Sequence, residues 1–125
     1  MSGKTILYVE DNELNRKIVR DLLKRTTYTL SEAFDGEAGV AMALETKPGL
    51  ILMDIQLPKI SGMEAMRRIR LEAAMAATPI IAITSFALSG DEQKAKAAGA
   101  TAYLAKPYSP LVLLGLIREL LPEGG

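Results

Sequence analysis

The sequence predicts an α/β fold in which five short strands alternate with five helices and form one parallel sheet with helices on both faces. Three observations support this prediction. Five apolar or β-branched runs are each followed by a segment with helical periodicity, the pattern of consecutive strand–helix–strand units. The run at residues 50–53 is apolar at every position, as expected for a parallel strand buried on both faces. No linker, internal repeat or low-complexity tail interrupts the alternation.

Length and composition limit the possible functions. A chain of 125 residues fits one domain, which we expect to span residues 1–125 without an output domain. The net charge is zero and the pI is about 6.3, so there is no electrostatic case for binding nucleic acid or an anionic membrane. The absence of cysteine and histidine excludes disulfides, thiolate or imidazole metal ligands and triads that need either residue. No signal peptide or membrane-spanning stretch is found, so we expect a cytoplasmic protein.

The first strand is predicted at residues 5–9, and a helix follows from Asn12. The apolar residues of this helix recur at helical spacing: Leu14, Ile18, Val19, Leu22 and Leu23. Its basic residues take the other face: Arg16, Lys17, Arg20 and Lys24. We expect the basic face to be solvated, with contact to an acidic partner surface as the alternative.

A second strand is predicted at residues 28–34. The turn at Asp35 and Gly36 then leads into a helix that carries Val40, Ala41 and Leu44.

The third strand, residues 50–53, ends at Asp54. A charged side chain beside a buried strand must open onto solvent or meet a cation, unless it only caps the turn. Residues 57–58 keep the chain extended, and Ser61 and Glu64 have the spacing of a capping box that begins a helix.

Two more strands and helices complete the chain. A strand at residues 79–83 ends at Thr84, and a second capping box, Ser89 to Glu92, opens an alanine-rich helix that Gly99 ends. The fifth strand, residues 101–105, ends at Lys106. Ser109 and Pro110 then provide an N-cap and a first helical residue for a last amphipathic helix.

Polar side chains follow four of the five strands. Ligands of open α/β sheets bind at the carboxyl ends of the strands, where these side chains can share one crevice. The set comprises Glu10, Asp11, Asp54, Thr84 and Lys106. Carboxylates this close repel one another, and a hard divalent cation such as Mg²⁺ relieves the repulsion.

The same set predicts phosphoryl chemistry. A carboxylate can accept a phosphoryl group as an aspartyl phosphate, which makes Asp54 the candidate nucleophile. Thr84 and Lys106 would supply a hydroxyl and a positive charge to the phosphoryl oxygens. Taken singly, Thr84 is more often a turn residue and Lys106 a solvated charge; their joint placement at strand ends favours the functional interpretation.

Four segments resemble the receiver domain of bacterial two-component response regulators. They are VEDN at 9–12, LMDIQLPKISG at 52–62, IAITSFA at 81–87 and AYLAKP at 102–107. The resemblance covers essentially the whole chain and is greatest to free-standing cell-cycle regulators of the DivK type. It implies a flavodoxin-like, doubly wound sheet of five parallel strands in the order 2-1-3-4-5, flanked by five helices.

The resemblance also implies roles for single residues. Asp54 is the phosphoacceptor, while Asp11 binds Mg²⁺ directly with support from Glu10, a position where many receivers have Asp. Gln56 would bind the metal through its backbone carbonyl, and Thr84 and Lys106 would bind the phosphoryl group. Tyr103 would be the aromatic residue that switches rotamer, and Pro107 the proline that follows a cis peptide.

The implied partners are a sensor histidine kinase or a histidine phosphotransfer protein as phosphoryl donor, and a downstream protein target. The target would bind the face formed by the helix after Gly90, the strand at Tyr103 and the last helix. Residues 86–88, Phe-Ala-Leu, either belong to that face or pack under the sheet edge. A monomer or weak dimer is expected, with phosphorylation acting on the surface and no product released by turnover.

Three other functions were considered. An aspartyl-nucleophile phosphatase needs a second carboxylate two residues after the nucleophile, where this chain has Gln56. A nucleotide-binding protein is disfavoured because neither GxxxxGK[ST] nor GxGxxG occurs. An interaction module that keeps the receiver fold but needs no phosphorylation stays open as the alternative, although it has no physical need for the charged set.

Overall fold

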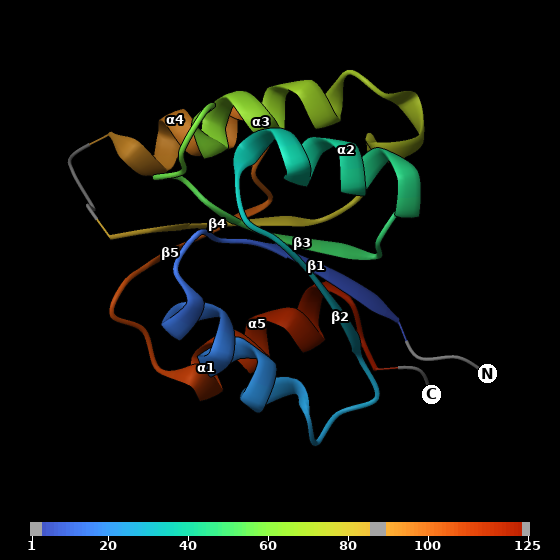
Figure 1. Ribbon diagram of the computed structural model, residues 1–125, viewed down its shortest axis with the longest axis vertical. Coiled ribbons are helices and arrows are strands. Elements are labelled where there is room, and N and C mark those ends of the chain that lie inside the picture. Colours follow the sequence, from blue (N-terminus) through green and yellow to red (C-terminus); the bar gives the residue numbers. More distant parts are fainter. Residues whose placement is uncertain (1–3, 86–89, 124–125) are drawn as a thin grey trace.

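The computed structural model describes residues 4–85 and 90–123. Across these residues, strands and α-helices alternate from the start of the chain to its end (Figure 1). The strands are β1 (Thr5–Val9), β2 (Thr29–Ala33), β3 (Leu50–Asp54), β4 (Ile80–Thr84) and β5 (Ala102–Ala105). The helices are α1 (Glu13–Leu23), α2 (Gly36–Thr46), α3 (Gly62–Arg70), the 3-10 turn η1 (Ala73–Met75), α4 (Asp91–Ala98) and α5 (Pro110–Leu120).

All strand pairs are parallel, and the strand order is β2-β1-β3-β4-β5. Helices α2, α3 and α4 cover one face of the sheet, and α1 and α5 cover the other (Figure 1). This arrangement confirms the flavodoxin-like, doubly wound fold predicted from the sequence. Strand β5 lies at one edge, between α4 on one side and α5 on the other.

The alternation of side chains along each strand divides the core into two layers. On β1, Leu7 and Val9 pack in the layer under α2, α3 and α4, whereas Ile6 and Tyr8 pack in the layer under α1 and α5. Every residue of β3 is buried, as predicted for a central parallel strand.

Two of the three predicted N-cap residues are found at the start of their helices. The Ser61 hydroxyl accepts a hydrogen bond from the Glu64 amide at 3.1 Å, which confirms this cap of α3. Ser109 is the N-cap of α5, although its side chain makes no capping hydrogen bond. The N-cap of α4 is Gly90, so the predicted Ser89 cap is wrong, and Ser89 itself lies outside the described residues, as do residues 86–88.

Helix α1 corrects one prediction. Arg16, expected on a solvated face, is only 8% exposed, while Leu14 and Ile18 of the expected apolar face are 67% and 43% exposed. The reason is local: the Arg16 guanidinium donates to the Glu10 carbonyl at 2.9 Å and turns inward at the end of β1. Val19 and, one turn later, Leu23 anchor the helix on the sheet.

A close backbone approach fixes the end of β3. The Gly62 amide donates to the Ile55 carbonyl at 2.9 Å, and a Cβ at Gly62 would lie 2.0 Å from the Asp54 carbonyl oxygen. Only glycine fits there, so the loop from β3 to α3 is held against the strand end that carries Asp54. In the part of the chain that the structure describes, no helix is long and apolar enough to span a bilayer.

Candidate functional site

The register of the sheet brings the predicted residues to one edge. Val9 is paired with Met53, so Glu10 and Asp54, one residue further on, end adjacent strands. Thr84 is paired with Ala105, and Lys106 follows directly. These four residues and Asp11 therefore surround one crevice at the carboxyl ends of β1, β3, β4 and β5, as parallel topology predicts.

Three carboxylates form the acidic part of this crevice. Glu10, Asp11 and Asp54 each offer one oxygen atom, and these atoms lie within 4.8 Å of one another. Glu10 and Asp54 are 1% and 3% exposed, whereas Asp11 is exposed to solvent. Carboxylate oxygens are the ligands that Mg²⁺ prefers, so the chemistry of this donor set fits a magnesium ion.

Glu10 is surrounded by hydrogen-bond donors. Its Oε1 accepts from the Tyr8 hydroxyl at 3.1 Å and from Lys106 Nζ at 2.9 Å, and its Oε2 accepts from the Asn12 amide at 3.2 Å. Burial alone would raise the pKa of Glu10, but the hydrogen bond and positive charge of Lys106 outweigh it and hold that pKa below its usual range. Glu10 is therefore a stable anion.

Asp54 has fewer donors in the described part of the chain. Its Oδ1 accepts from the Gln56 amide at 3.0 Å, and its Oδ2 lies 3.7 Å from Lys106 Nζ. Burial, followed by the negative charge of Glu10, raises the pKa of Asp54 to about 7. Asp54 thus has less charge compensation than Glu10, and a divalent cation would add to it.

Lys106 is the cation shared by both carboxylates. Its side chain is 16% exposed, and its ammonium is nearer to Glu10 than to Asp54. Burial lowers the pKa of Lys106. The hydrogen bond to Glu10 and the negative charge of Asp54 raise that pKa by more, so the net shift is upward. The side chain stays protonated.

Gln56 links the ends of β3 and β4. Its Nε2 donates to Thr84 Oγ1 at 2.9 Å, and its Oε1 accepts from the Ser85 amide at 3.1 Å. The sequence assigned only the backbone carbonyl of Gln56 to the site, because a contact between residues 28 positions apart leaves no local signal.

Tyr8 and Arg16 were not predicted as site residues. Tyr8 could have been found, since residues two apart on a strand share a face and Tyr8 therefore lies on the same side as Glu10. Burial and the charge of Glu10 raise the pKa of Tyr8 far above its usual value, so the phenol keeps its proton and acts as a donor. Arg16 had no such signal, because its pattern on α1 resembled that of the solvated Lys17.

Pro107 and Tyr103, the two other residues to which the resemblance gives roles, lie at the β5 edge of the sheet. The peptide between Lys106 and Pro107 is cis. Tyr103 packs on the layer under α2, α3 and α4, and its buried hydroxyl has no hydrogen-bond partner among residues 4–85 and 90–123.

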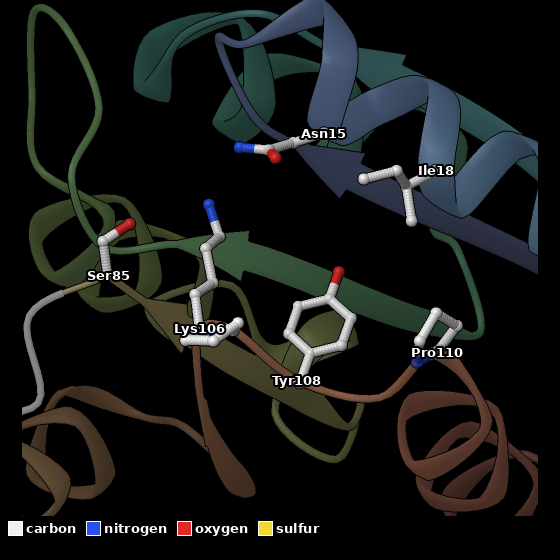
Figure 2. Close-up of a pocket in the computed structure, with 7 residues that line it drawn as sticks. Asn15, Ile18, Ser85, Lys106, Tyr108 and Pro110 are labelled. Atoms are coloured by element: carbon white, nitrogen blue, oxygen red, sulfur yellow. The ribbon is translucent and has the colours of Figure 1, made fainter.

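A pocket of about 560 Å³ adjoins the crevice between α1 and the segment that follows β5 (Figure 2). The Lys106 ammonium and the Tyr108 hydroxyl point into it. Its lining is formed by Asn15, Ile18, Ser85, Lys106, Pro107, Tyr108 and Pro110. The exposed Ile18 of α1 is thus part of a concave surface next to the acidic site.

Comparisons with known proteins agree with this geometry. A family model for the response regulator receiver domain matches residues 6–118. The chain is 42% identical over 120 residues to the polar-differentiation response regulator DivK of Brucella anthropi, a match that covers 96% of this chain and 98% of that protein.

Solved structures give the same result. The chemotaxis response regulator CheY4 of Vibrio cholerae matches with a TM-score of 0.88 at 30% identity, covering 94% of this chain and 98% of that one. The receiver domain of a sensor histidine kinase from Pseudomonas aeruginosa PAO1 matches with a TM-score of 0.87 at 35% identity, covering 95% and 98%; that structure has a magnesium ion coordinated in its active site cleft. The sequence motifs, the sheet order and these matches agree that the chain belongs to the response regulator receiver domain family.

Proposed function

We propose that this chain is a cytoplasmic response regulator that accepts a phosphoryl group on Asp54 in a Mg²⁺-dependent reaction. The donor is a phosphohistidine of a sensor histidine kinase or of a histidine phosphotransfer protein. The observation that carries the proposal is the position of Asp54 among Glu10, Asp11 and Lys106, with carboxylate oxygens within 4.8 Å and the ammonium at 3.7 Å.

The residues have distinct roles in this reaction. Glu10, Asp11, Asp54 and the backbone carbonyl of Gln56 would hold Mg²⁺, which supplies charge neutralisation for the transferring phosphoryl group. An Asp54 oxygen forms a P–O bond while the P–N bond of the donor breaks, and the bonding pair stays on the imidazole nitrogen.

The remaining side chains act on the product. Lys106 pairs with the phosphoryl oxygens through its ammonium, and Thr84 donates its hydroxyl to them. In this structure Thr84 Oγ1 accepts a hydrogen bond from Gln56 Nε2, and a hydroxyl can accept one hydrogen bond while it donates another. Phosphorylation adds about −1.5 to −2 charges at neutral pH, which is enough to bias a loop between two positions.

The output is a change of surface. Movement of Thr84 on β4 would open space beside Tyr103, whose hydroxyl lacks a hydrogen-bond partner in the described part of the chain and so gives up no bond when it moves. A downstream protein would then bind the face formed by α4, β5 and α5, which meet at the β5 edge of the sheet (Figure 1). On this proposal the chain is a phosphoryl acceptor, with possible autodephosphorylation, and not a turnover enzyme.

The test is the intact mass of the protein after incubation with acetyl phosphate, with and without Mg²⁺. We expect a Mg²⁺-dependent gain of one phosphoryl group in the wild type and none in Asp54→Asn. If the wild type gains no phosphoryl group from acetyl phosphate or from a phosphorylated histidine donor, the alternative of a phosphorylation-independent interaction module replaces this proposal.

A further inference from the structure

Tyr8 places a phenol hydroxyl beside the acidic crevice from inside the core. The residue is fully buried among apolar side chains of the layer under α1 and α5. Its hydroxyl donates to Glu10 Oε1 at 3.1 Å. Burying a hydroxyl is unfavourable unless it is hydrogen-bonded, and phenylalanine would fill nearly the same volume without that cost. Packing alone therefore does not explain why this position carries a hydroxyl group.

Lys106 uses the same oxygen atom. Its Nζ lies 2.9 Å from Glu10 Oε1 and 3.7 Å from Asp54 Oδ2, so the ammonium is hydrogen-bonded to Glu10 in this structure. The proposed function requires this ammonium to pair with a phosphoryl group on Asp54. When Lys106 turns away, the buried Glu10 carboxylate loses its charged donor, which is costly in a water-poor site.

We propose that Tyr8 is a positioning residue of the phosphoacceptor site, whose hydroxyl keeps Glu10 Oε1 hydrogen-bonded and so releases Lys106 to the phosphoryl group on Asp54. This inference rests on the proposed function. Tyr8 touches neither the metal nor the phosphoryl group, and it acts through Glu10. Tyr108, which lines the neighbouring pocket, is close enough to Tyr8 to raise the pKa of its hydroxyl.

The experiment compares the wild type with Tyr8→Phe in the full chain. Two titrations by isothermal calorimetry are needed: Mg²⁺ alone, and beryllofluoride in saturating Mg²⁺ as a phosphoryl mimic. In Tyr8→Phe we expect the Mg²⁺ affinity to stay within about twofold of the wild type, because Glu10 keeps its charge. We expect the beryllofluoride affinity to fall about tenfold, which corresponds to the loss of one hydrogen bond to a charged group.

Tyr28→Phe is the matched control. Tyr28 is also buried, and its hydroxyl donates to the Leu121 carbonyl at the opposite end of the molecule from the crevice. This variant loses the same chemical group, so it loses stability but binds beryllofluoride like the wild type. Glu10→Asp provides a second test, since the shorter side chain withdraws the carboxylate from Tyr8. Adding Tyr8→Phe to that background then changes the beryllofluoride affinity less than about twofold.

The outcomes separate the two proposals. A wild type that binds no beryllofluoride in Mg²⁺ overturns both the proposed function and the role of Tyr8. A wild type that binds it while Tyr8→Phe binds it equally well overturns the role of Tyr8 alone. The same conclusion follows if Tyr8→Phe lowers the Mg²⁺ and beryllofluoride affinities by equal factors, or if the tenfold loss persists in the Glu10→Asp background.

Discussion

Glu10 directly follows β1 and Asp54 ends the adjacent strand β3; both are almost fully buried, yet their environments are opposite. Glu10 accepts hydrogen bonds from the Tyr8 hydroxyl, the Lys106 ammonium and the Asn12 amide. Within residues 4–85 and 90–123, Asp54 accepts one, from the Gln56 amide. Accordingly the pKa of Glu10 lies below its usual range, because Lys106 outweighs burial, while burial and the Glu10 charge raise the pKa of Asp54 to about 7.

This difference shows that donors, and not burial, decide which carboxylate of the pair is a stable anion. Glu10 is a fixed part of the framework, with its charge already compensated. Asp54 has less compensation, since Lys106 lies 3.7 Å from it, so it gains most from a metal ion. Three substitutions and Mg²⁺ binding test this contrast, in order of decreasing effect.

Lys106→Met removes the ammonium that both carboxylates share. Leaving Glu10 without its charged donor should lower the free energy of unfolding by roughly 2–3 kcal/mol, somewhat less than for a fully buried pair. Phosphoryl acceptance from acetyl phosphate should fall about a hundredfold or more, because transition-state charge loses a donor. Urea denaturation and intact mass measure the two effects. Lys96→Met, which removes a surface pair with Glu92, is the control and should change stability by less than about 1 kcal/mol.

Asp54→Asn removes the less compensated of the two charges. The pKa of Asp54, about 7 in the fold, is above its ordinary value of 3.8, so folding favours the protonated carboxyl. Its contribution to stability is complete below about pH 4 and is lost as the pH rises through about 7. At pH 8 without metal, Asp54→Asn should therefore be more stable than the wild type by roughly 1–2 kcal/mol, with a smaller difference at pH 5. Parallel stability–pH curves for the two proteins would contradict the assignment.

Mg²⁺ should compensate Asp54 in the wild type. At about ten times its Kd, an ion that binds only the folded state adds about 1.4 kcal/mol to the free energy of unfolding. Thermal unfolding with and without MgCl₂ measures this gain. It should be smaller at pH 6 than at pH 8, since protons compete for Asp54, and smaller again in Asp54→Asn. An equal gain in both proteins would place the ion elsewhere.

Gln56→Ala leaves the contrast in place. The hydrogen bond to Asp54 comes from the backbone amide and survives, while the side-chain bonds to Thr84 and Ser85 are lost. We expect a loss of about 1 kcal/mol in stability and no change in the titration of Asp54 followed by carboxyl ¹³C NMR. Gln93→Ala, at an exposed position of α4, is the control for stability. A shifted Asp54 titration would show that the side chain also compensates its charge.

Much of the molecule follows from the sequence alone. Sequence patterns located the five strands and five α-helices of the described residues, but not the 3-10 turn η1. Strand bounds such as 28–34 differ by one residue at each end from the observed Thr29–Ala33. The alternation of strands and helices predicts a parallel sheet. In a parallel sheet the residues at the carboxyl ends of the strands lie at the same edge, which brings together Glu10, Asp54, Thr84 and Lys106. These properties are local or topological, so they can be predicted without coordinates.

Tertiary structure decided which partner each polar group has. The sequence placed Arg16 on a solvated face, but its guanidinium is buried against the Glu10 carbonyl, since the end of β1 offers an acceptor that helical periodicity does not reveal. The predicted role of Gln56 involved only its backbone carbonyl, whereas its side chain donates a hydrogen bond to Thr84 at the end of the neighbouring strand β4. Lys106 hydrogen-bonds Glu10 at 2.9 Å and lies 3.7 Å from Asp54, and Tyr8 shares that Glu10 oxygen. Such choices depend on distances between side chains of different strands, which sequence spacing does not determine.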